Sequence, residues 1–242
     1  MAAPAGPSPA LDLPVVGNDV VDLDRPRCAG KAEDRRFVER VFTAFEQSCI
    51  MDAPDRDRAL WRRWAAKEAA YKVVTKLLGA APVFEHAAFA VGIDPDGASG
   101  TVAYREFTMP FTLHEGSDHL HTVAIHSGGR CPDYRVVAGI EGADTEGHPP
   151  LDTLRSQFTP AERPFIHGAP SALARLAARR DMAAALAVAQ EDILILAAGD
   201  RPGRMPPVVR VDGDLGRVDL SLSHDGRYVA WAFLFGPGSG AF

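Results

Sequence analysis

The chain has 242 residues, 46% of them hydrophobic, and a formal net charge of −6 at pH 7. This length and apolar content suffice for one large domain or two small domains with a buried core. The negative charge argues against a general nucleic-acid surface, which needs clustered basic residues. No run approaches the roughly 20 apolar residues of a membrane span. We therefore expect neither nucleic acid nor a membrane as a partner.

The cysteines and the two ends of the chain carry no targeting or disulfide pattern. Cys28, Cys49 and Cys131 are odd in number and lack metal-ligand spacing, so a reducing cytoplasm is the expected location. Residues 1–13 have neither a basic nor an apolar segment of a signal peptide, and we expect a disordered lead-in there. Residues 236–242 are expected to form a frayed tail.

In chain order, the first half begins with the apolar segment VVGNDVVDL (15–23), which carries two aspartates. Helical periodicity predicts helices over 33–50 and 57–78, and Gly79 and Pro82 mark the end of the second. Alternating apolar residues predict four short strands. They are expected near 87–93, 100–107, 109–114 and 119–126.

The second half is predicted to contain the same kinds of element. Residues 142–152 are rich in turn formers, so we place a linker there, between a lobe over 14–141 and a lobe over 153–235. Helices are expected near 160–167 and 171–188. Strands are expected near 191–197, 207–211, 217–223 and 227–235. The fold class is therefore α+β with two similar lobes.

Matched segments in the same order suggest a tandem duplication. FTAFE (42–46) corresponds to FTPAE (158–162), and FTLHEGSDHLHTVAI (111–125) corresponds to LSLSHDGRYVAWAF (220–233). On the long helices, Lys67-Glu68 corresponds to Arg179-Arg180. One lobe thus has an acid where the other has a base.

Three segments together resemble the 4′-phosphopantetheinyl transferases, which move the phosphopantetheine arm of coenzyme A onto a serine of an apo acyl or peptidyl carrier protein. They are VVGNDVVDL, WAAKEAAYK (64–72) and DLSLSHDGRYVAWAF (219–233). The resemblance covers nearly all of residues 14–235. It implies two lobes related by a pseudo-twofold axis, each a small antiparallel sheet packed with a long helix. It also implies a monomer with the active site between the lobes.

The resemblance implies a magnesium-dependent reaction in which Asp19, Glu68 and Lys72 are the catalytic residues. Magnesium is usually held by one or two carboxylates together with substrate phosphates, and Asp19 and Glu68 could supply that pair. Lys72 is four residues after Glu68 on one helix face and could approach the same pyrophosphate. The alternative is an ordinary Glu68–Lys72 surface ion pair beside a turn-forming Asp19.

Asp22 has two open interpretations. It stands at the D-x-x-E spacing of the short, single-lobed family members, which would make it a third metal ligand. On an extended strand, however, a residue three positions along points to the opposite face from Asp19, which favours a structural role.

The resemblance also assigns residues to coenzyme A. Ser223 and His224 correspond to a serine-histidine motif that contacts its phosphates, and Arg204 belongs to a segment, GRMPP (203–207), similar to a phosphate-contacting element. Ser171 and Arg179 lie on the helix that resembles the one binding the 3′-phosphate. We assign Arg175, on the same helix, to structural pairing.

The order of the segments implies a circular permutation, because long family members present the serine-histidine motif first and the acidic residues later. A second hypothesis is a catalytically degenerate relative that binds coenzyme A or a carrier protein. A zinc site built from His114, His119, His121 and His126 is disfavoured, since nothing supplies a further ligand. Carriers of fatty-acid, polyketide and nonribosomal-peptide synthesis share an acidic helix. A basic stretch over 56–63 could meet that helix, and the alternative is an ordinary solvated face.

Overall fold

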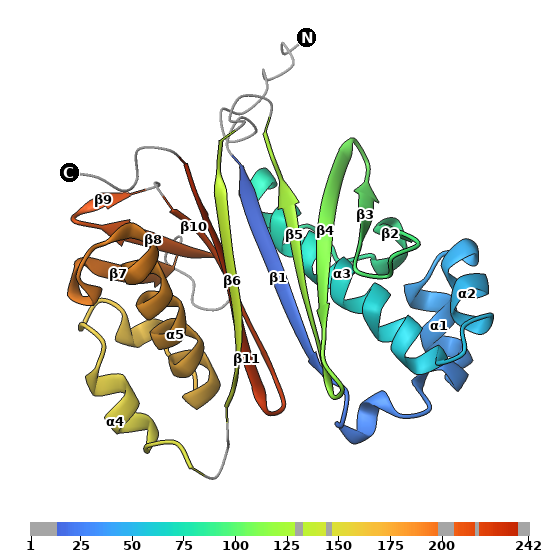
Figure 1. The fold of residues 1–242 in the computed structure, drawn as a ribbon, viewed down its shortest axis with the longest axis horizontal. Helices are drawn as coiled ribbons and strands as arrows, with labels where there is room; N and C mark the ends of the chain where they lie inside the picture. Colours follow the sequence, from blue (N-terminus) through green and yellow to red (C-terminus); the bar gives the residue numbers. More distant parts are fainter. Residues whose placement is uncertain (1–13, 129–132, 144–146, 198–205, 216–217, 237–242) are drawn as a thin grey trace.

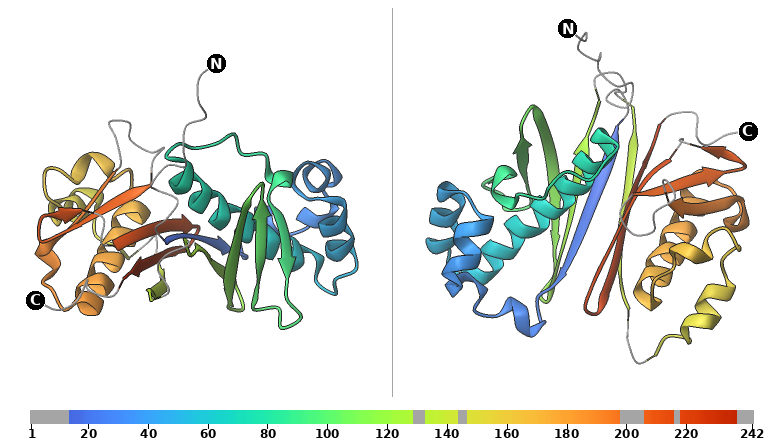
Figure 2. Two further views of the ribbon diagram at one scale, coloured as in Figure 1. Left: turned by 90° about the horizontal axis from the view of Figure 1, so that it is seen from above. Right: turned by 180° about the vertical axis from the view of Figure 1, so that it is seen from behind.

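The computed structural model describes residues 14–128, 133–143, 147–197, 206–215 and 218–236. Its first lobe contains one five-stranded antiparallel sheet in the order β1-β5-β4-β3-β2, with the long helix α3 across one face (Figures 1 and 2). Two shorter helices lie beside α3. The elements are β1 (Val15–Asp22), α1 (Arg35–Val41), α2 (Ala44–Met51), α3 (Arg56–Leu78), β2 (Ala90–Ile93), β3 (Ser99–Tyr104), β4 (Phe107–Glu115) and β5 (His119–His126).

The second lobe pairs another long helix, α5, with an antiparallel sheet in the order β10-β11-β6. A further sheet, β7-β8-β9, lies at its outer side (Figure 1). The elements are β6 (Arg135–Gly142), α4 (Leu151–Ser156), α5 (Ala169–Leu186), β7 (Ile193–Ala197), β8 (Pro207–Val211), β9 (Asp214–Leu215), β10 (Val218–Asp225) and β11 (Tyr228–Phe235). The predicted α+β class is thus confirmed.

Helix α3 has clear ends and an inner face of small residues. The Asp55 side chain accepts from the Arg58 N–H at its start, and Gly79 ends it in the left-handed conformation with φ 63°. Alanines on its inner face allow β1 to come so close that a Cβ on Gly17 would lie 2.0 Å from the Ala69 carbonyl oxygen. This close approach brings the polar residues of β1 within reach of the α3 lysines.

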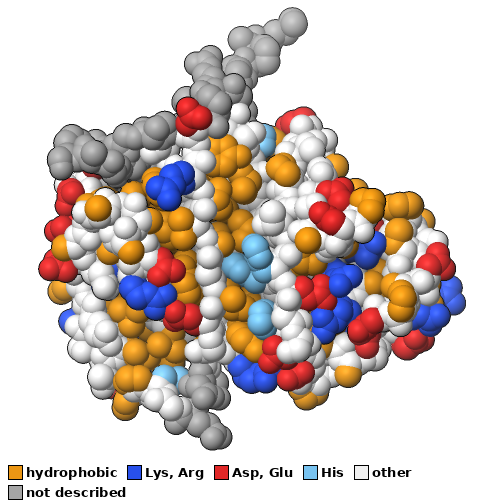
Figure 3. Space-filling model, in the orientation of Figure 1, with side chains coloured by type: hydrophobic (Ala, Val, Ile, Leu, Met, Phe, Trp, Pro, Cys, Tyr) orange, Lys and Arg blue, Asp and Glu red, His pale blue; other side chains and the backbone are white. Residues whose placement is uncertain are grey.

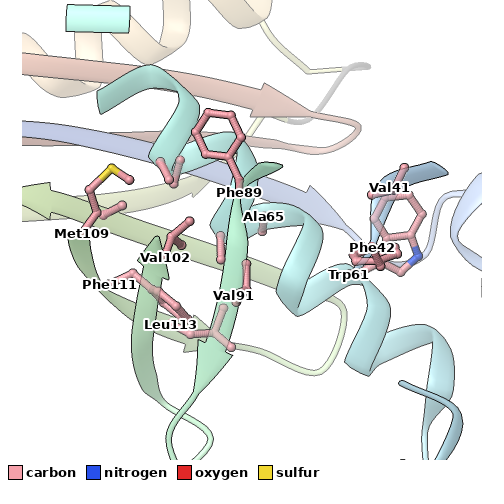
Figure 4. Close-up of a cluster of buried hydrophobic side chains, with 14 of the residues drawn as sticks. Val41, Phe42, Trp61, Ala65, Phe89, Val91, Val102, Met109, Phe111 and Leu113 are labelled. Atoms are coloured by element: carbon pink, nitrogen blue, oxygen red, sulfur yellow. The ribbon is translucent and has the colours of Figure 1, made fainter. Parts of the chain in front are cut away.

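The core of the first lobe lies between α3 and the sheet. Phe89, Val102 and Met109 are fully buried there, together with Phe42 and Trp61 at the end near the short helices (Figure 4). The second lobe has its own core between α5 and the β10-β11-β6 sheet. Burial of these apolar side chains provides most of the stability of each lobe. No helix in the described parts of the chain combines the length and the apolar character needed to cross a membrane.

A buried polar cluster, the first clamp, holds the core elements of the first lobe together. Glu46 accepts from the backbone N–H of Thr43 at 2.7 Å and from that of Val91 at 2.7 Å. Its two oxygens each accept from Lys67 Nζ at 2.9 Å, and both charged side chains are almost completely buried. The Lys67 ammonium also lies 5.5 Å from the ring centroid of Phe42. The clamp joins α2, α3 and β2.

The second lobe contains a matching cluster, the second clamp. Glu162, also fully buried, accepts from the backbone N–H groups of Thr159 at 3.0 Å and Ile195 at 2.9 Å and pairs with Arg179. The Arg179 guanidinium lies 4.9 Å from the ring centroid of Phe158. Each FTxxE segment thus supplies the phenylalanine, the threonine and the acid of its own clamp, which is the arrangement expected of a duplicated unit.

The two lobes meet along β1 and β10. One edge of β1 pairs with β5, and side chains from alternate residues of β10 satisfy N–H groups on its other edge. The pairs are Val16 N to Asp219 Oδ2 (2.7 Å), Asn18 N to Ser221 Oγ (2.9 Å) and Asp22 N to Asp225 Oδ2 (3.1 Å). A small apolar cluster that includes Val16 and Leu234 packs beside them. The alternating polar residues of β10 therefore serve as the edge cover of β1.

The structure differs from the predicted elements at three helical segments. The helix expected over 33–50 is divided at Phe42 and Thr43, because Thr43 and Glu46 form a capping box that starts α2. The helix expected near 160–167 is only a 3₁₀ turn (Arg163–Phe165), since the Glu162 side chain hydrogen-bonds to the backbone of β7 in the second clamp. The short helix α4 instead begins within the predicted linker.

The lobe boundary also differs from the predicted one. Strand β6 pairs along its whole length with β11, for example Val137 with Phe233, so residues 135–142 belong to the second lobe. The change of lobe lies between β5 and β6 rather than at 142–152. The turn-rich segment predicted as a linker connects β6 to α4 inside the second lobe. The predicted lead-in 1–13 and residues 237–242 of the predicted tail lie outside the described residues.

Candidate active site

Asp19, Glu68 and Lys72 come together on the α3 side of β1, as the sequence predicts. The Lys72 ammonium donates to the Asn18 carbonyl oxygen at 2.6 Å and to Asp19 Oδ1 at 3.1 Å. Glu68 lies one helical turn before Lys72, on the same face of α3. The side chains of Asp19 and Glu68 are only 15% and 22% exposed. Two carboxylates thus share a poorly solvated site with one lysine.

The electrostatics of this site are unfavourable for two ionised carboxylates. Burial and, to a smaller extent, the charge of Asp19 raise the pKa of Glu68 to about 7, although Lys72 partly opposes them. Burial likewise raises the pKa of Asp19, and Lys72 opposes that shift. A further positive charge would stabilise both carboxylates. The pair therefore fits a divalent cation that keeps water and substrate oxygens as its other ligands.

No larger metal cluster exists in the described ranges. Among those residues, no group of three or more His, Cys, Asp or Glu side chains is placed to hold a metal ion. Two histidines of β5 instead lie at or near the contact between the lobes: His119 packs on Tyr228, and His121 Nε2 lies 3.1 Å from Nδ2 of Asn18, which also donates to Ser223 of the second lobe. Histidine side chains gather near the middle of the molecular face shown in Figure 3.

A groove between the lobes extends from Lys72 along β10. A cavity of about 540 Å³ is lined by residues that include Lys72, Lys76 and Leu222. A second, of about 260 Å³, shares Leu222 and adds Arg175 and His224. A third, of about 760 Å³, shares His224 and continues to Arg25, Asp225 and Arg227. Neighbouring cavities share wall residues, so they adjoin one another, and we refer to the three together as the groove.

His224 faces the acidic site from the second lobe. It is exposed near the end of β10, as expected, and lines two of the three cavities. Burial lowers the pKa of His224, and the charge of Lys72 lowers it further; Asp225 opposes this shift, and Arg175 adds to it. A histidine, a lysine and an arginine from the two lobes therefore surround one part of the groove. Such a surface suits an anionic ligand.

Ser171 and Arg175 lie together in the groove wall. Arg175 Nη1 donates to Ser171 Oγ at 2.7 Å and to its carbonyl oxygen at 3.2 Å. Among the described residues, no carboxylate lies within ion-pair distance of Arg175, and its buried Nε has no hydrogen-bond partner. Arg175 thus has a structural partner in Ser171, and its guanidinium also lines the groove.

Arg179, which the sequence assigned to phosphate, has a different position. Its side chain is 9% exposed and is held by Glu162 and the Gln157 carbonyl oxygen in the second clamp. It is the counterpart of Lys67 rather than a groove residue. The available clue was the repeat itself, since both cations follow an FTxxE segment.

Ser223 and Asp22 also have structural partners. Ser223 Oγ accepts from Asn18 Nδ2 at 2.9 Å and is 7% exposed, so it joins the lobes instead of facing the groove. The Asp22 carboxylate accepts a hydrogen bond from the backbone N–H of Arg227 at 2.9 Å and another from the Arg227 guanidinium at 2.7 Å. It points away from Asp19, as strand alternation predicts. These contacts correct the assignments of Ser223 to substrate and of Asp22 to metal.

The other basic residues of the sequence analysis do not add a described cation to the groove. Arg204 lies outside the described residues. In the basic stretch over 56–63, Arg58 and Arg62 both pair with Glu115. A lysine that the sequence analysis did not single out, Lys76, bridges the lobes by donating to Asp219 Oδ2 at 2.7 Å and to two carbonyl oxygens. Its spacing of four residues from Lys72 was the clue to its position.

Comparison with known proteins gives one family match. The model of the 4′-phosphopantetheinyl transferase superfamily matches residues 15–127, nearly all of the first lobe. A holo-[acyl-carrier-protein] synthase of Chloroflexus aurantiacus is 47% identical over 60 residues, covering 24% of this chain and 44% of that protein. One of Roseiflexus castenholzii is 34% identical over 98 residues, covering 40% of this chain and 59% of that protein.

A larger protein and a solved structure are also similar. The fatty acid synthase alpha subunit hexA of Dothistroma septosporum is 32% identical over 125 residues, covering 51% of this chain and 37% of that protein. The chain thus spans less than two thirds of the length of each of these curated relatives. The holo-[acyl-carrier-protein] synthase structure of Thermotoga maritima aligns with a TM-score of 0.37 at 16% identity, covering 60% of this chain and 74% of that one.

Proposed function

We propose that this chain is a member of the 4′-phosphopantetheinyl transferase superfamily, whose model matches its first lobe, and that it transfers the 4′-phosphopantetheine group of coenzyme A to a serine of an apo acyl or peptidyl carrier protein. The products are the holo carrier protein and adenosine 3′,5′-bisphosphate. The observation that carries this proposal is the meeting of Asp19, Glu68 and Lys72 with His224 at one groove between the lobes.

Magnesium is the proposed metal, held by Asp19 and Glu68. Both carboxylates are poorly solvated and have raised pKa values, and magnesium favours one or two carboxylates completed by water and phosphate oxygens. When bound, it would neutralise charge that develops on the pyrophosphate oxygens. Lys72 is held beside Asp19 and can donate to the same oxygens.

The proposed reaction is a displacement at phosphorus. The serine Oγ forms a bond to the phosphorus that carries the pantetheine arm, and the bond from that phosphorus to the bridging oxygen breaks. The bridging oxygen leaves on adenosine 3′,5′-bisphosphate, and Lys72 stabilises its charge. Glu68 takes the serine proton, directly or through water, because a carboxyl with a pKa of about 7 can exchange protons near neutral pH.

The groove supplies the proposed coenzyme A site. His224 and Arg175 face it with cationic or hydrogen-bonding groups, and Ser171 lies beside Arg175. We assign the 3′-phosphate to Arg175 and Ser171, in place of Arg179. An arginine that, among the described residues, has no carboxylate within ion-pair distance is well suited to a phosphate, which it can bind through two N–H groups.

We also propose that the chain is a long, two-lobed family member whose lobes occur in permuted order. The family model covers the first lobe, which holds the acidic residues, whereas the groove histidine comes from the end of the second lobe. The matched clamps support descent of both lobes from one unit. A single chain then provides both halves of the site.

The test is to incubate the full chain with coenzyme A, magnesium and a panel of apo carrier proteins from fatty-acid, polyketide and nonribosomal-peptide systems. Mass spectrometry should show the gain of one phosphopantetheine group on a carrier serine. A Glu68→Gln variant is the matched inactive control. Binding of coenzyme A or carrier without transfer would contradict the proposal and support the degenerate relative instead.

A further inference from the structure

A row of stacked rings runs beside Glu68 on the surface of α3. The rings of Trp64 and His86 are 4.9 Å apart with an interplanar angle of 23°. Those of His86 and Phe84 are 3.9 Å apart at 30°, and those of Phe84 and Tyr71 are 4.2 Å apart at 23°. Trp64 and Tyr71 flank Glu68 on the helix, so the loop that carries His86 is laid along this face of α3.

His86 is fixed in this row from two directions. Its ring is packed between those of Trp64 and Phe84. Its carbonyl oxygen accepts from Lys67 Nζ at 3.1 Å, which ties its backbone to the first clamp. The imidazole is 22% exposed. A side chain packed between two rings, on a backbone that a buried ammonium anchors, has little freedom to turn away.

The imidazole of His86 lies beside Glu68. His86 Nε2 is 3.9 Å from Glu68 Oε1, a polar contact longer than a hydrogen bond, while the charges of Asp19 and Lys72 act on the same carboxylate. We propose that His86 is a positioning residue whose Nε2–H restrains the Glu68 carboxylate from the side of the ring row. This inference rests on the proposed function, because it assigns a role around the carboxylate that is to act there.

A purely structural role for His86 makes a different prediction. If only the stacking mattered, phenylalanine would serve as well, since it stacks on Trp64 and Phe84 without an N–H. If the N–H orients Glu68, glutamine should serve better than phenylalanine, because its amide can donate to a carboxylate. Groups that orient metal-binding side chains typically contribute 10–100-fold to metal affinity or activity.

The experiment compares His86→Phe and His86→Gln in the full chain, with Mn²⁺ as the probe. Mn²⁺ binding is measured by electron paramagnetic resonance with coenzyme A present, and transfer kinetics are measured separately. We expect His86→Phe to weaken Mn²⁺ binding and lower kcat by roughly 10-fold, with KM for coenzyme A changed less than about twofold. His86→Gln should recover most of the loss. His126→Phe, at a half-buried histidine packed against Phe107, is the control and should leave both unchanged.

A double variant separates this inference from general damage. In a Glu68→Gln background, adding His86→Phe should cause no further loss of Mn²⁺ binding, because the two side chains act as one unit. Full Mn²⁺ affinity in folded His86→Phe, equal losses for His86→Gln and His86→Phe, or an added loss in the double variant would each overturn the proposal. A wild-type chain that binds Mn²⁺ but transfers nothing would refute the proposed function and leave this comparison intact.

Discussion

The two lobes have the same framework and different chemistry at the residue after each clamp cation. In the first lobe, Lys67 of the clamp is followed by Glu68, a carboxylate with a raised pKa that faces Asp19. In the second, Arg179 is followed by Arg180, which pairs with Glu141 of β6 at 2.7 Å in an exposed ion pair. One lobe therefore keeps two acids in proximity, and the other neutralises its acid with a base.

The space beside the strand differs in the same way. Asp19 on β1 stands opposite Thr122, a small side chain that leaves room for Lys72 to reach the strand. On β6, Gly139 stands opposite Trp231, and a Cβ on that glycine would lie 2.3 Å from the indole ring. The second lobe thus fills with an aromatic ring the space that the first lobe uses for charged groups. Under the proposed duplication, the buried framework was preserved in both lobes, while the proposed site was kept in only one of them.

The largest expected effect is the loss of transfer activity when the charge of Glu68 is removed. Glu68→Gln should lower transfer by roughly 10²–10⁴-fold, because the amide neither binds metal well nor accepts a proton. The folded-state pKa of about 7 lies above the unfolded value of 4.5, so ionisation costs stability at pH 8. The variant should therefore be more stable at pH 8 by about 1–3 kcal/mol. Transfer assays and urea unfolding measure the two effects.

Arg180→Gln is the matched control for Glu68→Gln, because it changes the corresponding residue of the other lobe. Its exposed ion pair with Glu141 should contribute at most about 1 kcal/mol, and transfer should remain at the wild-type rate. A folded Glu68→Gln variant with near-normal turnover at saturating magnesium would contradict the assignment of the catalytic carboxylate to the first lobe.

The second prediction breaks the framework that the lobes share. Glu46→Gln leaves the Lys67 ammonium buried without its counter-charge, and Glu162→Gln does the same to Arg179. Each change should lower the free energy of unfolding by about 3–5 kcal/mol, the usual cost of removing one partner of a buried ion pair. Urea unfolding at pH 7.5 gives the values. Losses below about 1 kcal/mol in either variant would mean that the clamp is not structural in that lobe.

The sequence predicted α3 and the hairpins well because their information is local: caps, a terminal glycine and alternating residues. Strand β6 was missed since it is an edge strand with mostly exposed residues and two glycines, so it shows no alternation. Arg179 was misassigned because its partner Glu162 lies 17 residues away and becomes a neighbour only through packing. Likewise, the partner of Ser223 is Asn18, 205 residues distant in the chain. Long-range polar partners decide which basic and hydroxyl groups remain free for a ligand.

The third prediction concerns His121, a titratable side chain of the first lobe that lies near the contact between the lobes. His121 is 2% exposed, and burial lowers its pKa to about 3. In the unfolded chain the His121 imidazole takes up a proton near pH 6.5, whereas in the folded chain it stays neutral at that pH. The free energy of unfolding therefore decreases as the pH falls below about 6.5. Between pH 7.5 and pH 5.0 the cost should be about 2 kcal/mol. His121→Gln keeps an acceptor for Asn18 and should lose correspondingly less in urea unfolding at the two pH values.

Equal losses for wild type and His121→Gln would assign the acid sensitivity to other groups. The variant must first match the wild type at pH 7.5 within about 1 kcal/mol, since a larger deficit there would mean that the glutamine disturbs the contact itself.

The smallest expected effect is on coenzyme A binding, and it distinguishes Arg175, in the groove wall, from Arg180, on the surface of the same helix α5. Arg175 lines the groove without an acidic partner, whereas Arg180 is paired with Glu141. Arg175→Ala should weaken coenzyme A by roughly 10-fold and 3′-dephospho-coenzyme A by much less, because only coenzyme A carries the phosphate assigned to this guanidinium. Arg180→Ala should bind both ligands like the wild type. Isothermal titration with both ligands makes the comparison within one helix, so a change in helix stability would affect both variants. Equal weakening of the two ligands by Arg175→Ala would place the 3′-phosphate elsewhere and return Arg175 to a supporting role for Ser171, whose hydroxyl it contacts at 2.7 Å.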